Sequence, residues 1–237
     1  KLVGPQDGRE GSTLFYDQQI EPPQEEVHQI DRNLHLAKAV GAKIDQVTYD
    51  IFIAKEVKES IDQLLIDLEV DKAKKLIAIN PFTTWNAKDW FKDCYAKLAD
   101  KLIAQLDCEV LFTGGPSDES GVAEIIDTME QSAYNLAGKT SLTEVAELYT
   151  RVDLFIGGDT GPMHLAVAQG ALSEVLMGPT NPKTHGPYGD QHLVLQPDIE
   201  CKNCWNRDCP LDEHLCMEKI LVKEVFRAVS CKLSAKS

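Results

Sequence analysis

The sequence predicts an α/β fold in which a parallel, doubly wound sheet carries helices on both faces. From about residue 74 onward, short apolar runs alternate with helical patterns of about 10–15 residues. The runs at 76–80 and 153–156 are almost continuously apolar, as in parallel strands that are buried on both faces. Gly or Pro follows several of the runs, which places a turn at the end of each strand.

The first 73 residues are organised differently. Residues 1 to about 30 are polar, acidic and rich in loop-forming residues. Ile30, Leu34 and Ala37 have helical spacing and Gly41 follows them, so a helix is expected over 28–40. We expect residues 42–54 to be extended and residues 55–70 to form an amphipathic helix.

The remaining elements are expected in regular order. Ser141 and Glu144 have the spacing of a capping box and therefore mark the start of one helix. The expected strands are 76–80, 109–113, 133–136, 153–156, 174–177 and 193–195. The expected helices are 91–106, 119–130, one starting after Ser141, one starting near Pro162, and 218–233.

Length and charge restrict the class of protein. A chain of 237 residues fits one large domain or two small ones. The net charge of −14 argues against a nucleic-acid binder and against general attraction to anionic membranes, so a phosphate site would have to be local. No apolar run approaches the roughly 20 residues of a membrane span. The N-terminus has neither a signal-peptide pattern nor an initiator Met, so we expect a fragment or a processed form.

The stretch from Asp153 to Ala166 predicts a strand, a sharp turn and a helix start. Gly157 and Gly158 are expected to end the strand, and Pro162 suits the first turn of the helix. The N–H groups and the dipole at such a helix N-terminus favour an anion. An ordinary strand–turn–helix joint is the alternative, because the glycines form neither a P-loop nor a GxGxxG pattern.

Four loops are expected to meet at one edge of the sheet. Ligands of such sheets bind at the carboxyl ends of the strands, near a switch in strand order. The loops are 81–88, 114–119, 139–142 and 157–164. Their hydroxyl, lysine and glutamate side chains suit the phosphates and the ribose of a nucleotide.

Five motifs in these loops, in this order, resemble the ADP-heptose:lipopolysaccharide heptosyltransferases, glycosyltransferase family 9. They are NPFTTWNAKDW at 80–90, TGGP at 113–116 with Glu119, LAGKTSL at 136–142, GDTGPMHLA at 158–166, and GPTNP at 178–182. Residues 9–16 and 28–36 also resemble the end of this family's first domain.

The resemblance implies a GT-B fold, in which two Rossmann-like domains enclose the active site. Residues 1–50 would then be the C-terminal remnant of the acceptor domain and 51–73 a linking helix. Residues 74–217 would form the nucleotide-sugar-binding domain and 218–237 a C-terminal helix. The family's catalytic base is an acidic residue in the preceding part of the acceptor domain, so we expect it to lie outside this chain.

The resemblance also implies roles for individual residues. Lys88 would stabilise the leaving diphosphate as the catalytic cation, so no metal or other cofactor would be needed. Asp159, Thr160 and Gly161 would hold the diphosphate through backbone N–H groups, with His164 supporting the turn. Because a carboxylate repels phosphate, we expect Asp159 to cap its own helix or to contact a sugar hydroxyl.

The rest of the donor, and the acceptor, are implied in the same way. Thr83 and Thr84 would add hydroxyl contacts, Glu119 would bind the ribose, and Thr140 with Leu142 would line the base pocket. Arg9 resembles an arginine that faces the anionic acceptor. Simpler roles stay open: a solvated Lys88, a core His164, turn positions for Thr83 and Thr84, a helix-start charge at Glu119, and a pure N-cap at Asp159.

Four of the seven cysteines cluster at Cys201, Cys204, Cys209 and Cys216. The cluster is compact enough for zinc or an iron–sulfur centre, but its spacing matches no standard paired CxxC arrangement. Reduced structural thiols, a metal site and disulfides all remain open, although a cytoplasmic location disfavours disulfides.

The function that the resemblance implies is inverting transfer of a heptose from ADP-heptose to the lipopolysaccharide inner core. The enzyme would be cytoplasmic, with at most peripheral contact with the inner face of the inner membrane. Two alternatives differ in class: a nucleotide-binding module without transfer activity, and a metal-binding scaffold built on the cysteine cluster.

Overall fold

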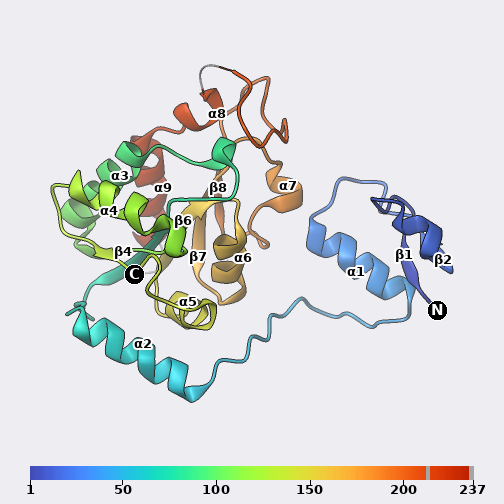
Figure 1. The fold of residues 1–237 in the computed structure, drawn as a ribbon, viewed down its shortest axis with the longest axis horizontal. Helices are drawn as coiled ribbons and strands as arrows, with labels where there is room; N and C mark the ends of the chain where they lie inside the picture. The colour runs from blue at the N-terminus through green and yellow to red at the C-terminus, as the bar shows by residue number, and fades with distance from the viewer. Residues whose placement is uncertain (212–213, 235–237) are drawn as a thin grey trace.

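Six parallel strands form the central sheet of the computed structural model, in which residues 1–211 and 214–234 are described (Figure 1). Their order is β5-β4-β3-β6-β7-β8, and every neighbouring pair is parallel. The strands are β3 (Lys75–Asn80), β4 (Cys108–Phe112), β5 (Tyr134–Asn135), β6 (Leu154–Gly158), β7 (Leu172–Leu176) and β8 (Leu193–Leu195). The predicted parallel sheet is therefore confirmed, and its strand order reverses between β3 and β6.

Helices cover both faces of the sheet, as a doubly wound fold requires. One face packs against α3 (Lys92–Leu106), α4 (Glu119–Asp127) and α9 (Val222–Ser234). The other face packs against α2 (Lys55–Asp67), α5 (Leu142–Tyr149) and α6 (Gly161–Ala168). Two apolar cores result, one on each side of the strands.

Local sequence explains most element boundaries. The predicted capping box is present, since the Ser141 hydroxyl accepts from the Glu144 N–H and the Glu144 carboxylate accepts from the Ser141 N–H. Three expectations were wrong in detail. The helix from Glu119 ends at Asp127, and the expected 218–233 helix is divided into α8 (Leu215–Glu218) and α9. Gly157 and Gly158 lie inside β6 rather than after it.

A small N-terminal lobe precedes the sheet domain. It contains a parallel pair of strands, β1 (Val3–Pro5) and β2 (Gln18–Ile20), and the helix α1 (Gln29–Ala39). No residue of α1 is buried, and residues 40–54 run as an extended segment from this lobe to α2 (Figure 1). The domain division proposed from the sequence stays a prediction.

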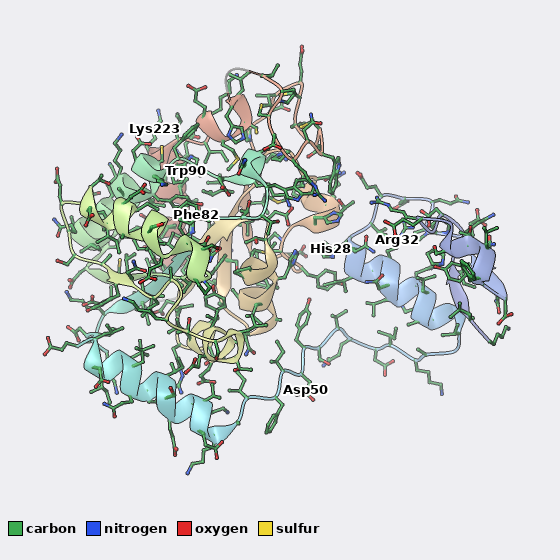
Figure 2. The ribbon with its side chains drawn as sticks, viewed as in Figure 1. His28, Arg32, Asp50, Phe82, Trp90 and Lys223 are labelled. Carbon is green, nitrogen blue, oxygen red and sulfur yellow. The ribbon has the colours of Figure 1, made fainter. Side chains whose placement is uncertain are left out.

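The lobe contacts the sheet domain at and beyond α7 (Pro182–His185). His28 lies on the side of α1 that faces the sheet domain (Figure 2), and its Nε2 is 3.0 Å from the Gly186 carbonyl oxygen. The Tyr188 hydroxyl donates to Asp31 at 2.6 Å, and the Asn181 amide donates to Glu26 at 2.7 Å. These polar contacts place one wall of a cleft opposite the carboxyl edge of the sheet.

One buried carboxyl group lies away from that cleft. Glu174 in β7 is fully buried, and neither of its carboxyl oxygens has a hydrogen-bond partner among the described residues. Alternation along the strand places it on the same face as Leu172 and Leu176, against the core that contains α9. Burial raises the pKa of Glu174 to about 8, so the carboxyl group is mostly neutral at pH 7.

Replacing Glu174 by Met should remove a pH-dependent loss of folding stability. The folded pKa of about 8 exceeds the unfolded value of 4.5, so this group makes the free energy of unfolding fall as pH rises through that window. In urea unfolding at pH 6 and pH 8.5, we expect the advantage of Glu174→Met over wild type to grow by about 2–3 kcal/mol. Glu218→Met, at an exposed position, is the control. An advantage that stays the same at both pH values would contradict the assignment.

Candidate functional site

The carboxyl ends of β3 and β6 meet closely at the point where the strand order reverses. Asn80 ends β3, and its buried side-chain amide donates to the Thr113 carbonyl at 2.9 Å, which ties β3 to the residue after β4. A Cβ atom on Gly157 would lie 2.9 Å from the Asn80 carbonyl oxygen, so only glycine allows β6 this approach. The loops that follow β3 and β6 are therefore held side by side.

A buried ion pair joins these two loops. The Lys88 Nζ, at the end of a 3₁₀ turn (Asn86–Lys88), lies 2.7 Å from Asp159 Oδ2 and 3.1 Å from the Asp159 carbonyl oxygen. Their side chains are only 12% and 7% exposed. The His164 Nε2 lies 3.7 Å from the other carboxylate oxygen.

Asp159 is ionised in this setting. Burial alone would raise the pKa of Asp159, but the interactions with His164 and Lys88 outweigh burial and lower the pKa to about 2. Of the two roles expected for Asp159, capping of its own helix was wrong, and contact with a sugar hydroxyl stays a prediction. Thr160 occupies the N-cap position of α6, and Asp159 holds the lysine of the neighbouring loop instead.

The N-terminus of α6 lies directly after this pair. The Thr160 side chain makes no capping hydrogen bond, and Pro162 occupies the first turn. A Cβ atom on Gly161 would meet nothing within 4 Å, so the backbone there is accessible. The dipole and the first N–H groups of α6 favour an anion here, and beside them lies the Lys88 ammonium, whose charge is balanced by ionised Asp159.

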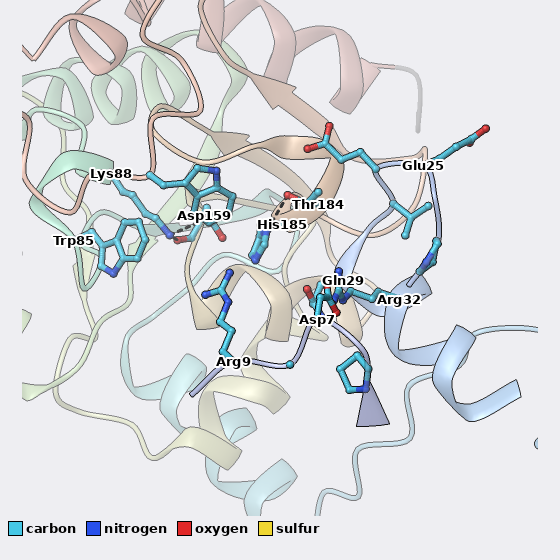
Figure 3. Close-up of a pocket in the computed structure, with 16 residues that line it drawn as sticks. Asp7, Arg9, Glu25, Gln29, Arg32, Trp85, Lys88, Asp159, Thr184 and His185 are labelled. Atoms are coloured by element: carbon cyan, nitrogen blue, oxygen red, sulfur yellow. Dashed lines mark hydrogen bonds and ion pairs between the residues drawn. The ribbon is translucent and has the colours of Figure 1, made fainter. Parts of the chain in front are cut away.

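A cleft of about 820 Å³ lies between this corner and the N-terminal lobe (Figure 3). Of the residues predicted for the site, Arg9, Lys88 and Asp159 line it. Arg9 extends across the cleft toward Asp159 and His185, as Figure 3 shows. Asp7 and Arg32 form an ion pair on the lobe side, and this pair lowers the pKa of Asp7.

The other predicted residues lie outside the lining of the cleft, on loops along the same edge. The Thr83 hydroxyl donates to the Trp85 carbonyl at 2.9 Å, and Thr84 is exposed. Glu119 is exposed and begins α4, and Leu142 is 76% exposed and begins α5. The Thr140 hydroxyl oxygen is buried and has no hydrogen-bond partner among the described residues.

Three aromatic side chains of the cleft were not predicted: Trp85, His185 and Trp205. Trp85 follows β3, His185 ends α7 after β7, and Trp205 lies in the cysteine-rich segment after β8. The rule that placed four loops at the carboxyl edge applies equally to the loops after β7 and β8. Extending it to those loops would have found two of the three.

The cysteine cluster packs behind the Lys88 turn. Cys201, Cys204, Cys209 and Cys216 line a small cavity of about 110 Å³ together with His214 and Ala87. The His214 Nε2 lies 2.7 Å from the Ala87 carbonyl oxygen, and Cys201, Cys204 and Cys216 are free thiols. Within residues 1–211 and 214–234, no group of three or more His, Cys, Asp or Glu side chains is arranged to hold a metal ion.

The sequence was compared with models of known protein families. Residues 4–215 match the model of glycosyltransferase family 9 (heptosyltransferase). The chain belongs to this family. The resemblance noted from the five sequence motifs is therefore confirmed.

Individual relatives agree with the family assignment. Lipooligosaccharide heptosyltransferase 2 of Campylobacter jejuni is 28% identical over 166 residues, which cover 68% of this chain and 52% of the relative. The family 9 glycosyltransferase structure from Veillonella parvula has a TM-score of 0.79 at 22% identity, covering 94% of this chain and 64% of that one. The structure of the E. coli heptosyltransferase WaaC with ADP has a TM-score of 0.69 at 21% identity, covering 97% and 65%.

These matches confirm the GT-B type of fold expected for a family 9 donor domain. The chain spans about half the length of the Campylobacter relative. What these relatives bind and transfer is therefore only a proposal for this chain.

The Lys88–Asp159 ion pair should make a measurable contribution to the free energy of unfolding. Asp159→Asn leaves the largely buried ammonium of Lys88 without its counter-charge, so we expect the free energy of unfolding to fall by about 2 kcal/mol or more. Urea unfolding at pH 7 gives this value.

The double variant Lys88→Met/Asp159→Asn is the matched control. It leaves neither charge unpaired and should recover most of the loss. If the free energy of unfolding falls equally in the single and the double variant, the two charges do not stabilise each other.

Proposed function

We propose that this chain is the donor-binding part of an inverting glycosyltransferase that moves a heptose from ADP-heptose to the inner core of lipopolysaccharide. The observation that carries the proposal is the Lys88–Asp159 pair beside the uncapped N-terminus of α6, at the reversal of the sheet. Anionic ligands of doubly wound folds bind at such a point. The names of the relatives, which are lipooligosaccharide and lipopolysaccharide heptosyltransferases, supply the sugar and the acceptor.

The diphosphate of the donor would lie between Lys88 and the first N–H groups of α6. An ammonium has three N–H donors, and among the described residues Lys88 uses two of them on Asp159. The third would be available to a phosphate oxygen, while Thr160 and Gly161 would donate through their backbone. When the glycosidic bond breaks, negative charge grows on the departing ADP, and the third N–H of Lys88 with the N–H groups at the start of α6 would stabilise it without a metal ion.

The nucleoside would extend from the diphosphate toward β4 and β5. Glu119, at the start of α4, would accept hydrogen bonds from the ribose hydroxyls. Thr140 and Leu142 would border the base, and the unpartnered Thr140 hydroxyl supports this because a base edge would satisfy it. Thr84 would add a contact, whereas the Thr83 hydroxyl would first have to leave the Trp85 carbonyl.

The acceptor would enter from the side of the N-terminal lobe. Arg9 points into the cleft and would attract an anionic acceptor (Figure 3). Inverting transfer needs a carboxylate that takes the proton of the attacking hydroxyl. Asp7 is a poor base, because its ion pair with Arg32 lowers its pKa. The prediction that the base lies outside this chain stays a prediction.

Two other functions compete with this proposal. A nucleotide-binding module without transfer activity would use the same donor site, and a metal scaffold would use the cysteine cluster instead. The match to the model of glycosyltransferase family 9 over residues 4–215 favours the donor site over the scaffold. None of the described helices is long and apolar enough to cross a membrane. From the lipopolysaccharide acceptor that the relatives' names supply, we propose a cytoplasmic enzyme that meets its acceptor at the inner face of the inner membrane.

Calorimetric titration with ADP tests the donor site. We expect binding to wild type, and at least tenfold weaker binding to Lys88→Ala, a loss of about 1.4 kcal/mol, because the variant lacks the cation beside the diphosphate. Lys92→Ala is the matched control, since Lys92 lies four residues away but pairs with Glu124 at the surface.

No binding of millimolar ADP by the folded wild-type protein would contradict both nucleotide hypotheses. Transfer itself is assayed with ADP-heptose as donor, on a form of the protein that contains both domains of the GT-B fold. ADP binding without any transfer there would favour the module over the enzyme.

A further inference from the structure

Beyond the nucleotide contacts, the structure assigns a platform for the donor sugar: we propose that Trp205, with His185 beside it, packs against the transferred sugar and positions it for attack. This inference rests on the proposed donor function. It concerns two residues outside the five sequence motifs, since His185 ends α7 and Trp205 lies in the cysteine-rich segment after β8.

The order of the strands indicates where the donor sugar would lie. From one side of the sheet to the other, the strands run β5, β4, β3, β6, β7, β8. The proposed contacts with the base, the ribose and the diphosphate follow β5, β4 and the β3–β6 junction in turn. A nucleotide sugar laid along this edge therefore brings its sugar to the loops after β7 and β8. Those loops carry His185 and Trp205.

Their geometry forms an aromatic corner in the cleft. The rings of His185 and Trp205 are 4.8 Å apart at 75°, and those of Trp85 and Trp205 are 6.4 Å apart at 73°. Trp205 is 43% exposed although it is a large apolar side chain, so part of its ring is available to a ligand. The C–H groups on one face of a sugar ring are apolar and carry partial positive charge, which suits the electron-rich face of an indole.

The aromatic corner adjoins Lys88, where the phosphate next to the donor sugar would bind. The Lys88 Nζ lies 4.3 Å from the centre of the Trp85 ring, and Trp85 contacts Trp205 edge-on. The bond that breaks in transfer joins the sugar to the phosphate. Placing the phosphate at Lys88 therefore places the first carbon of the sugar within reach of this corner.

The backbone at Trp205 is held in a conformation that a tryptophan rarely adopts. Its φ is +59°, in the left-handed region, which costs free energy for a bulky side chain. The Trp205 N–H donates to the Pro179 carbonyl at 2.9 Å, and the Ala87 N–H donates to the Arg207 carbonyl at 3.0 Å. The segment is thus fixed on both sides of the tryptophan, to the loop after β7 and to the Lys88 turn.

His185 completes the platform as a neutral ring. Burial lowers the pKa of His185, so the imidazole is uncharged at neutral pH. Its Nδ1 is 2.9 Å from the Thr184 hydroxyl, which leaves Nε2 for a sugar hydroxyl. A neutral ring next to Lys88 also avoids a second positive charge on the sugar side of the diphosphate.

Comparing ADP with ADP-heptose separates sugar contacts from nucleotide contacts. For each protein, the two Kd values are measured by calorimetry on this chain. We expect Trp205→Ala to bind ADP within twofold of wild type but to bind ADP-heptose at least fivefold more weakly, while Trp205→Phe keeps most of the sugar contact. Phe52→Ala, which truncates an aromatic ring that is 86% exposed in the linking segment, is the matched control.

Tryptophan fluorescence gives a second readout that does not depend on stability. The chain has three tryptophans, and Trp205 is the one expected to report on the sugar. We expect an emission change with ADP-heptose beyond that with ADP, and its loss in Trp205→Phe.

Three outcomes would overturn the inference: unchanged binding of both ligands by Trp205→Ala, an equal loss for both, or the same emission change for ADP and ADP-heptose. If the wild-type protein binds neither ligand, the donor function fails and the sugar platform fails with it.

Discussion

The buried ion pair between Lys88 and Asp159 fixes the relative position of the two loops on which the proposed site depends. One partner follows β3 and the other follows β6, the two strands between which the sheet reverses its order. Two charges are costly to bury, and each is tolerated because it is paired and hydrogen-bonded. The pair also explains how an aspartate can lie next to a phosphate site, because the ammonium of Lys88 balances its negative charge.

The rest of the structure supports this corner from three sides. The glycine at 157 lets β6 approach β3, and the Asn80 amide ties β3 to the end of β4. Behind the Lys88 turn, the cysteine-rich segment bonds to Ala87 through the Arg207 carbonyl and His214. The segment that contains the four cysteines also places Trp205 in the cleft.

Sequence periodicity predicted the fold well because parallel strands and their covering helices are determined by apolar patterns. The strands at 76–80 and 153–156 and the Ser141 capping box are of this kind. The pairing of Lys88 with Asp159 is a contact across 71 residues, and no local pattern encodes it. The two short strands of the N-terminal lobe were missed for a related reason, since three residues each carry too little periodicity to stand out. Trp205 was not predicted because it lies among cysteines far from the motifs in sequence, and no local pattern shows that this segment reaches the cleft.

The central claim is that the junction of β3 and β6 holds the diphosphate of a nucleotide, and backbone amide NMR tests it most directly. In a titration of the ¹⁵N-labelled chain with ADP, we predict the largest shifts for the amides of Thr160, Gly161 and Met163 and for the Lys88 turn. Smaller shifts should follow toward Glu119 and Thr140. Shifts confined to the cysteine-rich segment, or no shift at the start of α6 under saturating ADP, would contradict the account.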